Sequence, residues 1–218
     1  MSYKYGPSIV TDGLVFYVDA ANSKSYPGTG STVSDLVGSA SGTFAQQATY
    51  SSADGGSFVF DGTDDHISFG DIGSFTSATF SCWVKRSGSQ TAYTGLMISR
   101  PDATGIGIMD SGQIWYFWNG QNYQHSSGLS ISDGSWDMVT VTLDSSSGTV
   151  QFYKNTTSGT SDSYNGSSSS LEDAKIGIDE YNGSRALNGN IACFSIYDRA
   201  LTSDEVTQNY NALKNRFI

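Results

Sequence analysis

The stretch LNGNIACFSIYDRALTSDEV, residues 187–206, decides the fold prediction. It opens with an Asn-Gly pair at 188–189, the strongest short-range turn signal. The run at 190–198 then places large side chains at alternate positions, which is typical of a strand with one buried face. Beyond it the pattern changes abruptly to a helix start. A chain that is otherwise poor in helical signals therefore ends in a strand followed by a helix.

The helix start carries two local signals. Thr202 with Glu205 three residues later has the spacing of a capping box, and Leu201 with Val206 can form the hydrophobic staple across it. Further apolar residues recur at helical spacing: Val206, Tyr210, Leu213 and Phe217. We therefore predict a short C-terminal helix over 203–214, whose apolar side closes over the body of the protein.

Upstream of this stretch, strand-like runs recur at short intervals and are separated by Asp-Gly, Asn-Gly and Ser-rich turns. No helical segments lie between them, as a parallel sheet would require, so the pattern favours an antiparallel sandwich. We expect the Ser/Gly tract at 156–170 to be a surface loop. The chain is interpreted as a single domain over 1–218, with an N-terminal arm at 1–12. The further expected strands cover 13–20, 57–62, 66–70, 78–86, 94–100, 104–110, 112–120, 136–144, 149–155 and 174–180.

Composition and charge narrow the class of protein. Hydrophobic residues make up 37% of the 218 residues and aromatic residues 13%, which suffices for a sizeable core. The net charge is −10 and no run of Lys or Arg occurs. Because nucleic-acid binding needs a basic footprint, we expect no nucleic-acid partner. No segment approaches the roughly 18 apolar residues of a membrane span, so we expect no membrane insertion.

Several segments, in order along the chain, carry a family resemblance: GLVFYVDAANSKSYPGTG, GGSFVFDGTDDHISFGD, TFSCWVKR, DGSWDMVTVTLD and GNIACFSIYDRALTSDEV. Together they resemble the laminin-G-like, concanavalin A-like lectin/glucanase jelly rolls. The resemblance implies an all-β, antiparallel two-sheet jelly-roll sandwich with a short C-terminal helix. It says less about function, because this fold hosts lectins, hydrolases, adhesion modules and packing domains.

The terminal segments 6–28 and 200–217 look most like virion-associated proteins of tailed phages of aquatic bacteria. That resemblance implies a tail, fibre or capsid-surface component of a virion. We therefore expect a non-enzymatic virion surface protein that either recognises glycans on the host surface or decorates the particle. Its expected partners are other virion proteins and host-surface glycans, and homo-oligomerisation is left open. With no signal peptide at the N-terminus, we expect synthesis in the host cytoplasm and a final location in the virion. The alternatives are a purely structural packing protein without a ligand and a carbohydrate-active hydrolase.

Hydrolysis is the least favoured reading. Retaining glycosidases need two carboxylates about 5 Å apart, and in the glucanase branch of these jelly rolls two glutamates on one strand supply them. This chain has three glutamates, Glu172, Glu180 and Glu205, and none of them falls in such a motif. Glu205 is assigned to the helix cap. We therefore expect no enzyme activity and no catalytic residues.

A calcium site is the one cofactor expectation. Asp61, Asp64 and Asp65 place three carboxylates within five residues at a turn, and hard cations favour such oxygen ligands. The alternative is that Asp61-Gly62 forms the turn and that Asp64 or Asp65 caps backbone N–H groups there. In the closing strand, Ala192 stands where the family resemblance implies an aspartate ligand, so calcium is not expected at that place.

The candidate glycan site lies in GQIWYFWNGQNYQHSSG, residues 112–128. On a strand, Trp115 and Phe117 face one way while Tyr116 and Trp118 face the other. One pair is expected in the core and the other can form a sugar platform. The alternative is that both faces are covered, one by the second sheet and the other by loops. Sugars stack on flat aromatic rings edged by amide groups. The predicted ligand-binding residues are Tyr116, Trp118, Asn119, Gln121, Asn122, Tyr123 and His125.

Overall fold

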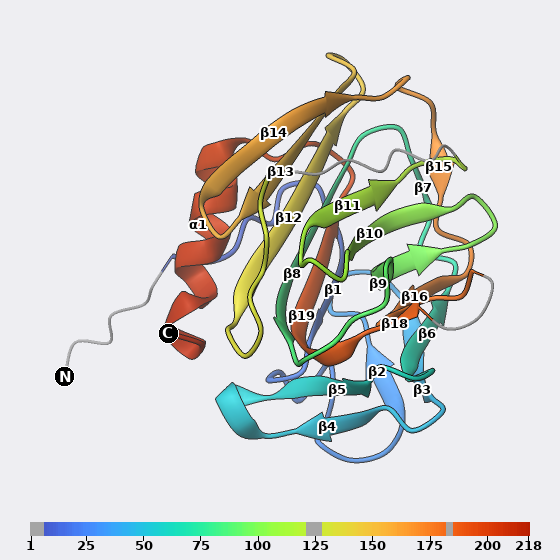
Figure 1. Cartoon of the computed structure of the whole chain (residues 1–218), viewed down its shortest axis with the longest axis vertical. Helices are drawn as coiled ribbons and strands as arrows, with labels where there is room; N and C mark the ends of the chain where they lie inside the picture. Colours follow the sequence, from blue (N-terminus) through green and yellow to red (C-terminus); the bar gives the residue numbers. More distant parts are fainter. Residues whose placement is uncertain (1–6, 121–127, 182–184) are drawn as a thin grey trace.

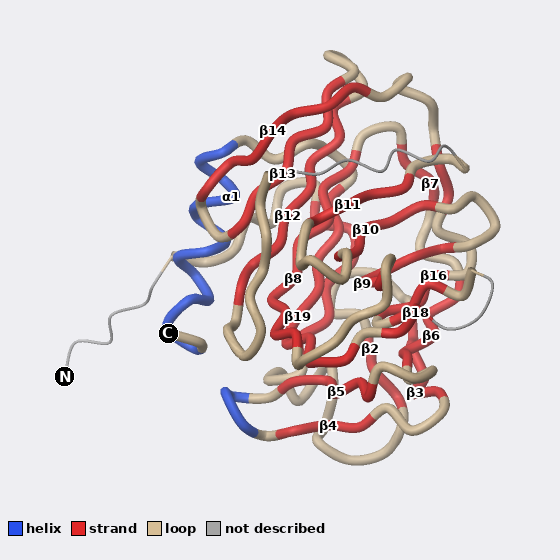
Figure 2. The backbone as a smooth tube through the Cα atoms, viewed as in Figure 1, coloured by secondary structure: helices blue, strands red, loops and turns tan. Residues whose placement is uncertain are grey.

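The computed structural model describes residues 7–120, 128–181 and 185–218. Two large antiparallel sheets lie face to face, and one α-helix of the described residues packs outside them (Figure 1; Figure 2). The predicted antiparallel sandwich with a C-terminal helix is confirmed. Within the described residues, no helix has the length and apolar content to cross a membrane.

The eight-stranded sheet is built around the closing strand of the quoted stretch. That strand, β19, pairs with β8 on one side and with β5 and β1 on the other. Its register against β8 shifts between Ile191 and Cys193, so Ala192 lies at a bulge. In spatial order the strands are β14 (Thr157–Ser163), β13 (Thr149–Lys154), β12 (Asp137–Asp144), β8 (Ala78–Arg86), β19 (Asn188–Tyr197), β5 (Ser57–Asp61) and β4 (Thr49–Ser51), with β1 (Leu14–Asp19) beside β19.

The seven-stranded sheet faces it across the core. In spatial order it contains β11 (Ile114–Phe117), β10 (Thr104–Ile108), β9 (Thr94–Ser99), β16 (Ala174–Ile176), β6 (His66–Gly70), β3 (Ser41–Ala45) and β2 (Thr32–Ser34). Two small ribbons and two short 3-10 helices are the remaining regular elements of the described residues. They are β7 (Ser74–Phe75) with β15 (Ser169–Ser170), β17 (Ile178–Asp179) with β18 (Arg185–Ala186), η1 (Ala53–Gly55) and η2 (Lys214–Arg216).

The Ser/Gly tract differs from its prediction. Residues 156–170 were expected to form a loop, yet Thr157–Ser163 form β14, an edge strand paired with β13. Asn155 turns the chain between the two strands with a positive φ of 58°. Most side chains of β14 are exposed. An edge strand of this kind needs only backbone pairing on one side, so it carries no hydrophobic alternation that sequence reasoning could detect.

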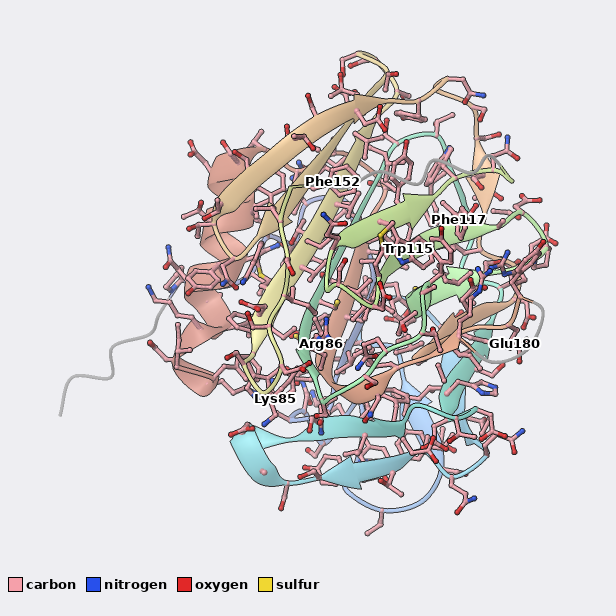
Figure 3. All side chains as sticks on the ribbon, viewed as in Figure 1. Lys85, Arg86, Trp115, Phe117, Phe152 and Glu180 are labelled. Atoms are coloured by element: carbon pink, nitrogen blue, oxygen red, sulfur yellow. The ribbon has the colours of Figure 1, made fainter. Side chains whose placement is uncertain are left out.

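One continuous core fills the space between the two sheets. Alternate residues of both sheets supply it, as the period-two pattern of the strands requires. Figure 3 labels one of these core side chains, Phe152 of β13. The large buried members include Phe16, Phe58, Phe80, Phe152 and Phe194 from the eight-stranded sheet, and Ile67, Ile106, Ile114, Tyr116 and Ile176 from the seven-stranded sheet.

The helix α1 (Ser203–Leu213) covers the outer face of the eight-stranded sheet (Figure 1). The predicted capping box is present, because the Thr202 side chain accepts from Glu205 N and the Glu205 side chain accepts from Thr202 N. Phe217, just beyond the helix, stacks on Trp83 with ring centroids 4.4 Å apart. Ala192 is fully buried in this same layer. The outer face of the seven-stranded sheet has no such cover among the described helices.

Candidate functional site

The structure reverses the expected roles of the aromatic residues on β11. The alternation was predicted correctly, but Tyr116 and Trp118 point inward and are 0% and 1% exposed. Tyr116 packs near Phe152 of the opposing sheet, with ring centroids 5.8 Å apart. Trp118 donates its indole N–H to Ser167 O at 2.7 Å. Neither ring can serve as an open sugar platform, because both lie between the two sheets.

The remaining predicted glycan residues follow β11. Asn119 is exposed in a turn with φ of 50°, and its Nδ2 donates to Ser167 Oγ at 3.1 Å. Gln121, Asn122, Tyr123 and His125 lie outside the described residues. Of the predicted set, Asn119 alone is therefore placed at the surface within the described part of the chain.

The other aromatic pair of β11 faces outward (Figure 3). Trp115 and Phe117, with Ile98 of β9, form a small cluster separate from the main core. Trp115 lies directly over Gly107 of β10, where an added Cβ would be 2.3 Å from its Cζ2 atom. Both rings are nonetheless 3% exposed or less. They therefore form the floor of this face and not its contact surface.

The ribbon β17–β18 lies on this floor. Its backbone crosses β9 at Gly95, where an added Cβ would be 2.3 Å from the carbonyl carbon of Ile178. Only glycine permits so close an approach of two backbones. The ribbon brings Asp179 and Arg185 opposite each other as a cross-strand pair.

Two guanidinium groups and three rings alternate across the face. Arg100, just after β9, lies 5.4 Å from the ring centroid of Phe117 and 4.7 Å from that of Tyr181. Arg185 lies 4.7 Å from the centroid of Tyr181 and 4.9 Å from that of Tyr93. Such stacking favours guanidinium over ammonium groups. We call this set the Arg–Tyr cluster: Tyr93, Arg100, Phe117, Asp179, Tyr181 and Arg185.

Asp179 holds the cluster together. Its carboxylate has no solvent exposure and accepts from Arg100 and from Arg185 Nη1, the latter at 3.0 Å. The side chains of the two arginines are 23% and 22% exposed. One buried carboxylate thus orients two partly exposed cations, and such charge-assisted hydrogen bonds are strong and directional.

Tyr181 is the exposed member of the cluster. Tyr181 is 48% exposed, which makes it one of the few large apolar residues on the surface of the described chain. The two guanidinium groups flank its ring, each 4.7 Å from the ring centroid, and its backbone N–H donates to Asp179 Oδ1 at 3.3 Å. An exposed aromatic ring edged by N–H donors can stack on a ring-shaped ligand and hydrogen-bond its rim.

An open hollow of about 410 Å³ lies at the rim of the sandwich. Arg86 is buried at 8% exposure and its Nε donates to Asp133 Oδ1 at 2.5 Å. The Gln90 side chain already hydrogen-bonds the backbone of Asn188, donating to its carbonyl oxygen and accepting from its N–H. The hollow offers hydrogen-bonding groups but no aromatic ring, so it is less suited to sugars than the Arg–Tyr cluster. It is lined by Arg86, Gly88, Ser89, Gln90, Asp110 and Asp133.

The structure gathers the predicted metal ligands. Oxygen atoms of Asp61, Asp64 and Asp65 lie within 4.8 Å of one another in the β5–β6 turn. Asp65 is 2% exposed, and its two oxygens accept from Gln47 N at 2.8 Å and from Asp61 N at 3.1 Å. Burial raises the pKa of Asp65, although these two backbone hydrogen bonds oppose the rise.

The turn therefore satisfies the capping alternative for Asp65. Asp61 takes part as well, because its Oδ1 accepts from Thr63 N at 2.7 Å. Asp61 and Asp64 are exposed and could supply oxygens to a hard cation, which takes about six to eight in total. Calcium at this turn stays a prediction.

The three glutamates differ in their contacts and exposure. Arg199 hydrogen-bonds the Glu205 carboxylate and lowers its pKa to about 2. Lys175 bonds Glu180 and also lies 3.0 Å from Asp173. Glu172 is exposed. Glu205 is thus held as an anion and cannot act as a general acid near neutral pH.

Sequence reasoning missed the Arg–Tyr cluster. A partial signal was available, because Asp179 and Arg185 flank the Asn-Gly pair at 182–183 at a spacing that suits cross-strand partners. Arg100 gave no such signal, since it lies 79 residues from Asp179 in the chain.

A sequence model of the concanavalin A-like lectin/glucanases superfamily matches residues 61–207. The chain belongs to this superfamily. The matched region runs from the Asp61 turn to α1 and contains every member of the Arg–Tyr cluster. No functionally curated protein matches the sequence.

Solved structures share the superfamily fold at low sequence identity. Domain 4 of AbnA, a GH43 extracellular arabinanase from Geobacillus stearothermophilus in complex with arabinotriose, is 20% identical with a TM-score of 0.70, over 90% of this chain and 98% of that one. Trypanosoma rangeli sialidase in complex with sialic acid is 13% identical with a TM-score of 0.69, over 96% of this chain and 34% of that one. The botulinum neurotoxin serotype D binding domain is 17% identical with a TM-score of 0.65, over 91% and 51%. This chain thus spans about a third of the sialidase and about half of the neurotoxin domain.

Proposed function

We propose that the chain is a non-enzymatic, lectin-like module that binds glycans on the outer face of the seven-stranded sheet. The observation that carries the proposal is the exposed ring of Tyr181, held between the guanidinium groups of Arg100 and Arg185. Sugars present apolar C–H faces and hydroxyl rims, so they stack on such a ring while its neighbours donate hydrogen bonds.

The similar structures support a carbohydrate ligand in general terms. The arabinanase domain, which this chain matches over nearly its full length, is described in complex with arabinotriose. The sialidase is described in complex with sialic acid. Because identity is low in both cases, the residues of this chain and not those of the neighbours define the proposed site.

The non-enzymatic part of the proposal rests on the acids. Glu205 caps α1 and is bound by Arg199, and Glu180 pairs with Lys175. Asp179, the acid at the centre of the Arg–Tyr cluster, is buried with both oxygens bound to arginine. A carboxylate whose two oxygens both accept from arginine side chains is not free to attack a sugar carbon.

The proposal also covers where the protein is located and which partners it has. The resemblance of the terminal segments supports a surface component of a tailed-phage virion, with other virion proteins and host-surface glycans as partners. Antibodies raised against this chain should label purified virus particles. Labelling confined to host cells without particles would contradict the virion setting and leave the glycan proposal in place.

A glycan array with the intact chain tests the function. We expect binding to a defined subset of glycans, reduced about fivefold or more by Tyr181→Ala, since aromatic contacts of this kind contribute roughly 1 kcal/mol. Val37→Ala is the matched control, because Val37 is a similarly exposed apolar residue at 45%. Absence of binding across a broad array would favour the structural alternative. Shortened oligosaccharides after incubation would favour the hydrolase.

A further inference from the structure

Arg185 is unusually well placed to receive a ligand. Its Nη1 donates to Asp179 Oδ2 at 3.0 Å, and its guanidinium plane is held near the rings of Tyr93 and Tyr181. Its Nε and Nη2 atoms have no acceptor among the described residues. The side chain is 22% exposed. One edge of the guanidinium group therefore fixes its orientation and the other edge, Nε–Nη2, is left with two unused N–H donors.

The second arginine of the cluster is occupied differently. Arg100 directs both Nε and Nη2 toward Asp179 Oδ1. Because Asp179 carries a single negative charge, it cannot neutralise both guanidinium groups. Arg100, Arg185 and Asp179 together keep one positive charge beside the exposed ring of Tyr181.

The charged side chains on and beside β16 pair with one another and not with Arg185. Lys175 of β16 forms ion pairs with Asp173 at 3.0 Å and with Glu180. No described contact joins either of these acids to Arg185. In a protein of net charge −10, the Arg–Tyr cluster is thus a place where a free cationic edge meets an exposed aromatic ring.

We infer that the ligand is an acidic glycan, whose carboxylate or sulfate group is bound by the Nε–Nη2 edge of Arg185 while its sugar ring rests on Tyr181. Two parallel N–H donors in a fixed plane match the two oxygens of a carboxylate or sulfate, and a lysine cannot reproduce this geometry. The inference rests on the proposed glycan-binding function and specifies the ligand class of the same site.

The test uses pairs of probes that differ at the acidic group. Oligogalacturonate is compared with its methyl ester, sialyllactose with lactose, and sulfated lactose with lactose, each titrated into the intact chain. We expect at least one acidic probe to bind about tenfold or more tightly than its neutral counterpart. The carboxylated and sulfated arms show which oxyanion is preferred.

Variants test whether the preference for acidic probes depends on Arg185. Arg185→Lys keeps the charge but removes the fork, so it should abolish most of the preference, and Lys24→Gln removes an exposed charge elsewhere as the control. The thermal midpoint of each variant, compared with that of the wild type, shows whether it is folded. Equal affinity for acidic and neutral probes, with binding still dependent on Tyr181, would overturn the inference and leave the proposed function standing. Acidic preference unchanged in folded Arg185→Lys would overturn it as well. Failure of every glycan to bind would contradict both proposals.

Discussion

Asp179 and Arg185 face each other across the β17–β18 ribbon, and Arg185 Nη1 donates to Asp179 Oδ2 at 3.0 Å. The same carboxylate also binds Arg100, which follows β9 and lies 79 residues away in the sequence. The ribbon is thereby fastened to the seven-stranded sheet by charge-assisted hydrogen bonds to a buried acid. The position of Tyr181, two residues after Asp179, depends on this link.

Replacing Asp179 tests that link. Asp179→Asn should lower the free energy of unfolding by about 2–3 kcal/mol, because two arginines lose their counter-charge in a largely buried setting. Their partial exposure keeps the loss below that of a fully buried pair. The measurement is urea denaturation. Asp12→Asn serves as the control, since Asp12 forms an ion pair at 86% exposure and should change stability by less than about 1 kcal/mol.

The corrected roles of the aromatic residues predict opposite behaviour for Trp118 and Tyr181. Trp118→Ala should cost about 3–5 kcal/mol of stability, because it empties a buried site between the sheets. Tyr181→Ala should cost about 1 kcal/mol or less, since nearly half of that side chain is exposed. Comparable losses for the two variants in urea denaturation would contradict the assignment of one to the core and the other to the surface.

The helix cap predicts a pH dependence. Arg199 lowers the pKa of Glu205 to about 2, below its usual value of 4.5. The stability from this ionised carboxylate is therefore fully present above about pH 4.5 and is lost as the pH falls toward 2. The difference in unfolding free energy between wild type and Glu205→Gln should shrink over that range. Glu172→Gln, at an exposed position, is the control, and a difference that stays constant down to pH 2 would count against the account.

The calcium prediction is tested at the β5–β6 turn. If calcium binds there, millimolar calcium should raise the thermal midpoint of the wild type, and Asp64→Asn should abolish the rise. Asp71→Asn, an exposed aspartate just beyond β6, should leave it unchanged. An identical thermal midpoint with calcium and with a chelator would show that the three aspartates form the turn without binding calcium.

Local features of the chain were predictable and long-range ones were not. The capping box at Thr202 and Glu205 follows from a spacing of three residues, so the sequence displays it directly. The alternation on β11 was visible too, but it could not say which face lies inside, and the pair Tyr116 and Trp118 was assigned to the wrong side. Alternation along a strand separates its two faces but does not show which face is buried. That is decided when the second sheet packs against one of them.

The candidate site shows the same limit. Asp61, Asp64 and Asp65 are near neighbours in sequence, so their gathering at one turn was expected. The Arg–Tyr cluster joins segments from the ends of β9 and β11 to the β17–β18 ribbon, and only folding brings these together. Gly95, whose missing Cβ admits the ribbon, gave no functional signal in the sequence.

A crystal structure of the chain soaked with its tightest-binding array glycan tests the central claim most directly. The account predicts a sugar ring stacked on Tyr181, with its polar groups within hydrogen-bonding distance of Arg185 or Arg100. A glycan bound instead in the rim hollow beside Arg86 and Asp133, with the Arg–Tyr cluster empty, would contradict it.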